Sequence, residues 1–355
     1  MWSNKAELET ALSAAGLGEW APRLAELARH CIIFVPSSIE EGAAAPIGAS
    51  RLGGQPDLPA DIDWPVRPPI DVKDTAGPVP GHLLLGPRHW LHRLFRTQEW
   101  VRVSRQWEDG LQAERDVRNR AWPLSFVAQI DFAEVHAVHA LDGFPPAGRL
   151  SLFCDPFDWP WGAGEDQVRA RAIFTEAPAG HLERKRPPQE FDEPAARQLM
   201  PRGYVFKPRV LRPTAWLLPP PLGSAEQPHV RASPEWAAWP AYEQFWCDLY
   251  ARNPETFGAT GEMIHQMGGT AFSIQEPVEA ECVKFTEHGP SLKRQHALTT
   301  EHLAQAGEWQ LVLQIDSDVE VGMEWGDVGR LYLCARKQDL AAGRFDRCWM
   351  VMQCY

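Results

Sequence analysis

The stretch AQIDF at residues 128–132 returns 185 positions later as LQIDS at residues 313–317. The tripeptide Gly-Arg-Leu follows each stretch, at 148–150 and again at 329–331. Apolar residues alternate with polar ones around both stretches, which predicts β-strands because successive side chains of a strand point to opposite faces. Two landmarks in the same order indicate that one strand-containing unit occurs twice in the sequence.

A pair of glycines precedes each stretch. Gly53 and Gly54 lie in RLGGQP, and Gly268 and Gly269 lie in QMGGTA. The second glycine of each pair stands 75 positions before its Gln-Ile-Asp in the first case and 45 positions before it in the second. The longer interval indicates an insertion, which we place near residues 88–120. Three landmarks in the same order predict a tandem duplication with pseudo-twofold symmetry.

The expected fold is therefore α+β and mainly antiparallel β, with two similar β-rich lobes and N-terminal helices. We expect the helices within residues 1–32 and the first lobe at 33–190, including the insertion near 88–120. A proline-rich connector at 191–230 would lead to the second lobe at 231–355. The insertion itself fits either a helix or an extended segment.

Local patterns predict several other elements. Asn4, with Glu7 three residues later, is typical of a helix start. Tyr242, Phe245, Trp246 and Leu249 follow the i, i+3, i+4, i+7 spacing of an amphipathic helix. EAECVKF, at residues 279–285, reads as an extended segment.

Composition excludes several classes of protein. The chain has 355 residues and a net charge of −12. A surface of that sign repels phosphate backbones and favours a basic partner, so we expect no nucleic acid. Seven cysteines, an odd number without CxxC spacing, indicate reduced thiols in a cytosolic protein. The charged start MWSNKAELETAL is not typical of a signal peptide, and no apolar run reaches the length that a membrane span needs.

The Gln-Ile-Asp stretches supply the first candidate ligand site. Gln129 and Asp131 share one face of a predicted strand, and Gln314 and Asp316 share the corresponding face of the other. If the pseudo-twofold axis brought these strands together, four polar side chains would converge on a ligand. The structural alternative, which we favour, is that the glutamine amides satisfy backbone groups of irregular loops.

Catalytic and metal-binding patterns are weak. His265 could act as a base oriented by Asp316 or Asp327, but no Ser or Cys is tied to it by spacing. The acidic run DSDVEVGMEWGD, at residues 316–327, has acidic residues at EF-hand ligand offsets but lacks the glycine and the glutamate of that loop. We predict no metal, no cofactor and no catalytic residue.

A second set of residues is expected to shape loops. The Gly-Gly loops match neither dinucleotide-binding nor P-loop patterns, so a turn with positive φ is the better interpretation. Four Trp-Pro pairs, the first at Trp64, indicate rigid loops with packed aromatic rings. The predicted structural residues are Gly53, Gly54, Trp64, Gly148, Gly268, Gly269 and Gly329.

Taken together, these stretches resemble the YwqG-like family of bacterial proteins, which has no established function. The resemblance is carried by SRLGGQPDLP, DWP, PLSFVAQIDF, GRLSLF, HQMGG, WQLVLQIDSD, WGDVGRLYL and the final FDRCWMVMQC. It implies a mainly β, α+β body with an internal duplication, and it brings no activity, cofactor or catalytic residue. Immunity or partner binding is suspected for some similar proteins.

The sequence discloses no reaction. Its charge, and the lack of a catalytic constellation, favour a cytosolic, non-enzymatic protein-binding module, in particular an immunity-type protein that neutralises a basic toxin or effector. The alternative is an enzyme or small-ligand-binding protein that uses the cleft between the two lobes.

Overall fold

The computed structural model describes residues 2–39, 44–70, 89–224, 226, 238–258, 263–287 and 297–355. Arg88, at the start of the expected insertion, and parts of the expected connector and second lobe lie outside these residues. The chain divides into two compact units. The first comprises Met1–Asp63, Ser125–Lys185 and Val205–Tyr355, and the second comprises Trp64–Leu124 and Arg186–Tyr204. Both expected lobes contribute to the first unit, and the expected insertion lies in the second.

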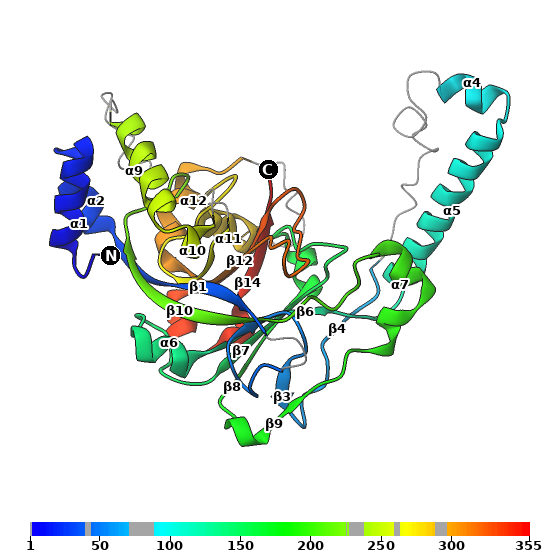
Figure 1. Ribbon diagram of the computed structural model, residues 1–355, viewed down its shortest axis with the longest axis horizontal. Coiled ribbons are helices and arrows are strands. Elements are labelled where there is room, and N and C mark those ends of the chain that lie inside the picture. Colours follow the sequence, from blue (N-terminus) through cyan, green and yellow to red (C-terminus); the bar gives the residue numbers. More distant parts are fainter. Residues whose placement is uncertain are drawn as a thin grey trace. The chain divides into compact units, whose positions relative to one another are not determined.

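A large antiparallel sheet organises the first unit (Figure 1). In the described part of the chain it has ten strands in the order β14-β13-β12-β11-β1-β10-β2-β6-β7-β8. Every pairing between neighbours is antiparallel, as the sequence predicted. The strands are β1 (Arg29–Ser38), β2 (Arg51–Leu52), β6 (Ser125–Asp131), β7 (Arg149–Cys154), β8 (Ala170–Thr175), β10 (Arg209–Leu218), β11 (His265–Gly268), β12 (Trp309–Asp316), β13 (Arg330–Arg336) and β14 (Trp349–Gln353).

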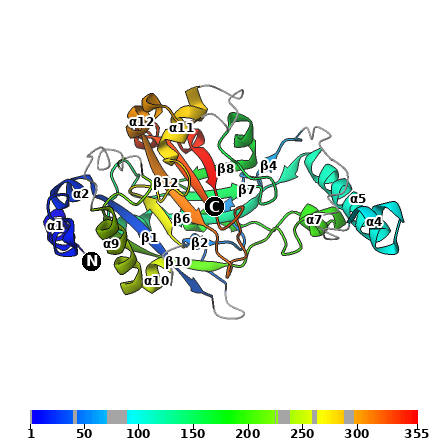
Figure 2. The same ribbon diagram turned by 90° about the horizontal axis from the view of Figure 1, so that it is seen from above.

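Strands β1 and β10 form the centre of the sheet and run side by side in both views (Figures 1 and 2). The other neighbour of β1 is β11, and the other neighbour of β10 is β2. The strand order therefore reads the same from both ends when β1, β2, β6, β7 and β8 are matched with β10, β11, β12, β13 and β14. The stretch expected to be a connector contains β10, one of the two central strands.

Prolines inside β1 and β10 explain why β10 did not read as a strand. Pro36 faces Leu211, and Pro213 faces Phe34. The amide of Leu211 donates to the carbonyl of Ser50 at 2.9 Å, on the β2 side, so this pair is not bonded across β1 and β10. By the same alternation, the nitrogen of Pro36 is directed to the side of β11, and that of Pro213 to the side of β2. Both neighbouring strands are short and end before they reach the proline, since β11 pairs with residues 31–34 and β2 with residues 209–210. The missing N–H groups therefore remove no ladder hydrogen bond.

The main core lies where the two ends of this sheet approach each other. It gathers Leu150 of β7 and Leu331 of β13, from opposite ends of the strand order, into one buried cluster. The side-chain amide of Gln167 exchanges two hydrogen bonds of 2.9 Å with the backbone of Met350 in β14. The sheet is therefore strongly curved and nearly closes on itself.

Helices cover the sheet of the first unit. Asn4 caps the first helix as predicted, and the expected stripe of α9 is buried. Residues 279–285 form part of a helix rather than the expected extended segment, because Val278, Cys282 and Val283 bury one helical face against β12 to β14. The elements are α1 (Lys5–Leu12), the π-helix η1 (Ser13–Leu17), α2 (Ala21–Leu27), α6 (Phe132–Val138), α9 (Trp239–Arg252), α10 (Pro254–Phe257), α11 (Val278–Glu287), α12 (Thr300–Gln305) and α13 (Lys337–Ala341), with a small sheet of β3 (Asp57–Pro59) and β9 (Leu182–Arg184).

The second unit is largely helical, which decides the open question about the insertion. Thr97 caps its long helix by accepting a hydrogen bond from the amide of Trp100 at 3.2 Å. Its small core contains Val117, Trp122 and Tyr204. No described helix is long and apolar enough to cross a membrane. The elements are α4 (His89–Leu94), α5 (Gln98–Arg118), the 3₁₀ helix η4 (Gln189–Asp192), α7 (Pro194–Leu199) and the pair β4 (Val66–Arg67) and β5 (Trp122–Pro123).

Candidate functional site

The side chain of Gln129 ties β6 to the first Gly-Gly loop. It is fully buried. Its Nε2 donates to the carbonyl of Ala49 at 3.1 Å, and its Oε1 accepts from the amide of Asp57 at 3.0 Å. Ala49 lies five residues before Gly54, and Asp57 lies three residues after it. The amide group therefore spans the loop and satisfies one backbone group on each side.

Gln314 does the same for the second Gly-Gly loop. Its Nε2 donates to the carbonyl of Ile264 at 2.9 Å, and its Oε1 accepts from the amide of Phe272 at 3.1 Å. Ile264 lies five residues before Gly269, and Phe272 lies three residues after it. Four strands separate β6 from β12 in the sheet order, so the two glutamines serve separate loops.

The aspartates of the two stretches also have matching partners. Asp131 pairs with Arg149 at 2.7 Å, and Asp316 pairs with Arg330 at 2.8 Å. Each arginine belongs to the Gly-Arg-Leu tripeptide of its own half. Burial raises the pKa of Asp316, against the opposing effect of Arg330, His265 and the hydrogen bonds that the carboxylate accepts.

Backbone amides of the same aspartates bind side chains at matching places. The amide of Asp131 donates to Ser50 Oγ at 2.9 Å, and the amide of Asp316 donates to His265 Nδ1 at 3.3 Å. Ser50 and His265 each lie four residues before the second glycine of their loop. His265 is thus an acceptor for the backbone at Nδ1, which places the proton of a neutral ring on Nε2.

The Gly-Gly loops need glycine for a conformational reason. All four residues have positive φ, between 57° and 75°. A Cβ at Gly53 would lie 2.4 Å from the carbonyl oxygen of Lys207, and one at Gly269 would lie 2.6 Å from Cβ of Cys31. The tight turn with positive φ is therefore the geometry of both loops.

The remaining structural residues also lie in crowded places. A Cβ at Gly148 would lie 2.4 Å from the ring of Phe174, and one at Gly329 would lie 2.2 Å from the carbonyl oxygen of Trp325. Trp64 belongs to the second unit, where its Nε1 donates to the carbonyl of Leu124 at 2.7 Å.

A buried ionic cage beside the first loop was missed by the sequence analysis. Asp57 accepts from Arg51 at 2.7 Å, from Arg184 at 2.9 Å and from the amide of Gly48 at 2.8 Å. Burial alone would raise the pKa of Asp57, yet the guanidinium groups of Arg184 and Arg51 hold that pKa below its usual range. Two members of the cage, Arg51 and Asp57, stand close together in RLGGQPD. The third, Arg184, lies 127 positions away from Asp57, and no local sequence pattern predicts its contact.

His265 faces an acid that differs from the expected one. Its Nε2 lies 3.7 Å from Oδ2 of Asp318, and both side chains are buried. Asp318 also accepts from the amides of Glu320 and Val321 at 2.9 and 3.2 Å, so it orders the acidic turn. Asp327 is exposed, and its carbonyl accepts from the amide of Tyr355.

The acidic run does not form a calcium loop. Asp316 and Asp318 point to Arg330 and His265, whereas Glu320, Glu324 and Asp327 are exposed. Within the described residues, no group of three His, Cys, Asp or Glu side chains is placed to hold a metal ion. The polar groups around both Gln-Ile-Asp stretches bind backbone groups and ion-pair partners, an arrangement that holds loops.

The chain belongs to DUF1963, a family that is described as a domain of unknown function and whose model matches residues 50–354. The match covers both Gly-Gly loops and both Gln-Ile-Asp stretches. No curated protein matches the chain.

Proposed function

We propose that this protein is a non-enzymatic protein-binding module and that its helical second unit carries the contact surface. The supporting observation is an exposed apolar patch on α4, the turn that follows it and the start of α5. Trp90, Leu94, Phe95 and Val101 are 56%, 67%, 70% and 37% exposed. Trp90 and Leu94 stand four residues apart, on one face of α4. Large apolar side chains gathered in this way typically mark an interaction surface.

The charge around this α4–α5 apolar patch indicates the chemistry of the partner. Four arginines and one glutamate lie between His89 and Arg105, although the whole chain carries −12. Charge acts locally, because salt screens it over roughly 8–10 Å. We therefore propose a protein partner with an apolar surface bordered by acidic groups, and aromatic and arginine side chains suit such a contact.

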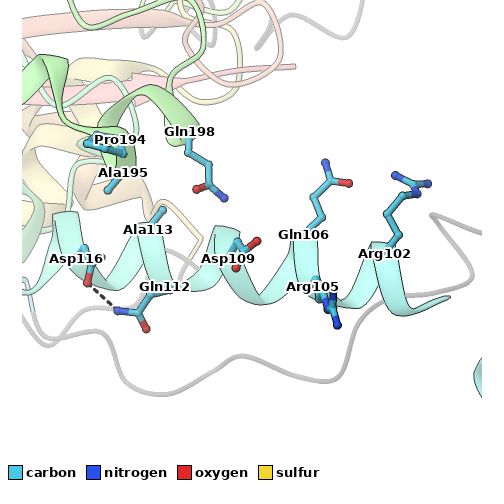
Figure 3. A pocket seen from close by; sticks show the side chains of 10 residues that line it. All are labelled: Arg102, Arg105, Gln106, Asp109, Gln112, Ala113, Asp116, Pro194, Ala195 and Gln198. Carbon is cyan, nitrogen blue, oxygen red and sulfur yellow. Dashed lines mark hydrogen bonds between the residues drawn. The ribbon is translucent and has the colours of Figure 1, made fainter. Parts of the chain in front are cut away.

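A groove continues the same surface along α5. It has a volume of about 630 Å³ and lies between α5 and α7 (Figure 3). Figure 3 shows Gln106 and Ala113 of α5 and Gln198 of α7 extending into the space between the two helices. Arg102 and Arg105 also line it. A partner seated on the apolar patch would thus meet polar side chains along this groove.

The specific hypothesis of an immunity-type protein that binds a basic toxin uses a different surface. It rests on the net charge of −12, which would draw a basic partner to acidic parts of the first unit. Both hypotheses describe a non-enzymatic protein-binding module, and they differ in the unit that makes the contact.

Affinity capture with matched variants tests the proposal. The double variant Trp90→Ser/Phe95→Ser should lose a partner that the wild type retains from its own lysate, because these exposed side chains contribute binding rather than folding. Val319→Ser, which alters a side chain that is 78% exposed in the first unit, should retain it. A partner held equally by all three proteins, or no partner at all, would contradict the proposed surface.

We also infer that the sheet of the first unit arose by internal duplication. Support comes from the palindromic strand order, the matched bonds of Gln129 and Gln314, and the prolines at positions 36 and 213. A β-bulge interrupts β6 between Phe126 and Ala128 and β12 between Leu311 and Leu313, 185 positions apart in each case. The narrower assignment to the YwqG-like proteins rests on the sequence stretches alone.

A further inference from the structure

A basic depression lies on the first unit, apart from both Gln-Ile-Asp stretches. Its volume is about 730 Å³, within the range typical of small-molecule sites. It is framed by α1, the start of β1, the segment that follows α6, β12 and α13. The charged and titratable side chains that line it are Lys5, Arg29, His30, His139, Asp142 and Lys337.

The local charge of this depression is opposite to that of the whole chain. Lys5, Arg29 and Lys337 line it together with one carboxylate, that of Asp142. Arg29 already pairs with Glu226 at 2.8 Å, and Nζ of Lys5 donates to a backbone carbonyl. The ammonium groups of Lys5 and Lys337 are exposed and retain donors for a ligand, since an ammonium group offers three.

Two stacked histidines occupy the same depression. The rings of His30 and His139 lie 4.2 Å apart, centroid to centroid, with an angle of 27° between their planes. Two imidazolium rings at this distance repel each other, and an anion bound beside them offsets that repulsion. Desolvation, together with the positive charges of His139 and Lys5, lowers the pKa of His30, and Asp142 opposes that effect.

We propose that this depression binds a small phosphate-bearing molecule and that binding is coupled to proton uptake by the His30–His139 pair. A phosphate group has several acceptor oxygens and more than one negative charge near neutral pH, which suits two lysines and two histidines better than a carboxylate does. This small-ligand site goes beyond the proposed protein contact and lies on the other compact unit.

Titration with inorganic pyrophosphate tests the site. Calorimetry should show that the affinity of the wild type, divided by that of His139→Gln to cancel the protonation of pyrophosphate itself, is about three- to tenfold higher near pH 6 than near pH 8, because proton uptake by the protein is linked to binding. In ¹H–¹³C spectra, the ring signals of His30 and His139 should move on addition of pyrophosphate. Those of His181, which is exposed elsewhere on the first unit, should not.

Variants at positions that are exposed or only half-buried keep the test independent of folding. Lys337→Ala should weaken pyrophosphate binding about tenfold by removing a charged donor. His139→Gln should remove the part of the pH dependence that the histidine pair contributes, whereas His181→Gln should leave affinity and pH dependence unchanged. The proposal is overturned if the wild type binds no pyrophosphate at either pH, or if Lys337→Ala and His139→Gln bind as the wild type does.

Discussion

Gln129 and Gln314 lie on strands separated by four others, yet each bridges the carbonyl five residues before, and the amide three residues after, the second glycine of its own loop. The ion pairs of Asp131 and Asp316 match in the same way. The repeated phrase in the sequence thus marks a repeated way of fastening an irregular loop to a strand.

Replacing either glutamine should destabilise the first unit. Gln129→Met and Gln314→Met keep the side-chain volume but remove both bonds of the amide group. Gln314→Met leaves the carbonyl of Ile264 and the amide of Phe272 without that partner. Gln129→Met does the same to the amide of Asp57, whereas the carbonyl of Ala49 keeps a bond of 3.3 Å from Arg51. We expect Gln314→Met to lower the free energy of unfolding by about 2–6 kcal/mol, from about 1–3 kcal/mol for each of two unsatisfied groups, and Gln129→Met to lower it somewhat less. Urea denaturation measures the loss. Gln310→Met, on β12 but half-buried, is the matched control and should cost far less.

The cage around Asp57 should be sensitive to acid. Asp57→Asn leaves Arg51 buried with a weakened partner, and we expect a loss of about 3–5 kcal/mol at neutral pH. Because the pKa of Asp57 is lowered in the folded protein, its contribution is present above the unfolded pKa and fades as the pH falls through the folded one. Urea denaturation of the wild type and of Asp57→Asn, at neutral and at strongly acidic pH, measures this effect. The difference in free energy of unfolding between the two proteins should be largest at neutral pH.

Asp346→Asn is the control for this cage. It breaks an exposed pair with Arg344, which water and salt screen, so the loss of stability should be small. Equal losses for Asp57→Asn and Asp346→Asn would show that the buried cage has no special role.

The buried Glu279 should make stability depend on pH in the opposite direction to Asp57. Burial, reinforced by the negative charge of Glu226, raises the pKa of Glu279 from 4.5 to about 7. The folded state then holds a proton that the unfolded state releases, so stability falls as the pH rises from 4.5 to about 7 and levels off above that value. Glu279→Gln cannot ionise and should exceed the wild type by up to about 3 kcal/mol near pH 8, with little difference near pH 4.5.

Thermal or urea unfolding of the two proteins at both pH values measures this effect. Glu276→Gln, at an exposed position beside the same helix, should follow the wild type. Parallel pH profiles for the wild type and Glu279→Gln would contradict the prediction.

Two glycine substitutions distinguish the cost of backbone strain at positive φ from the cost of a steric clash. Gly53→Ala places a Cβ 2.4 Å from a backbone oxygen at positive φ, whereas Gly322→Ala meets positive φ with no atom within 4 Å. We expect Gly322→Ala to cost about 1 kcal/mol and Gly53→Ala several times that, because the backbone of Lys207 has to move. Chemical denaturation of both variants checks the ratio, and similar costs would contradict the close approach.

The sequence predicted the elements whose pattern is local. The strands around Ile130 and Ile315, the capped start at Asn4 and the stripe of α9 all follow from spacing within a few residues. Strand β10 was not predicted, because Pro213 normally argues against a central strand and only the shortness of β2 permits it. Helix α11 was not predicted, because Ala280 and Cys282 also fit a period of two.

Little of the candidate surfaces could be predicted in this way. His30 and His139 are 109 positions apart, and only the packing of β1 beside the end of α6 stacks their rings. The exposure of Trp90 and Phe95 could not be predicted from the sequence either. The apolar residues of a helix have the same spacing whether their face is buried against another element or exposed to solvent.

The most direct test of the protein-binding function is to locate the contact. Hydrogen exchange of the wild type, measured with and without the captured partner, should show new protection in peptides from residues 89–105. The acidic turn at 316–327 should exchange as before. Protection confined to the acidic turn or to other peptides of the first unit, with none at 89–105, would contradict the proposed surface.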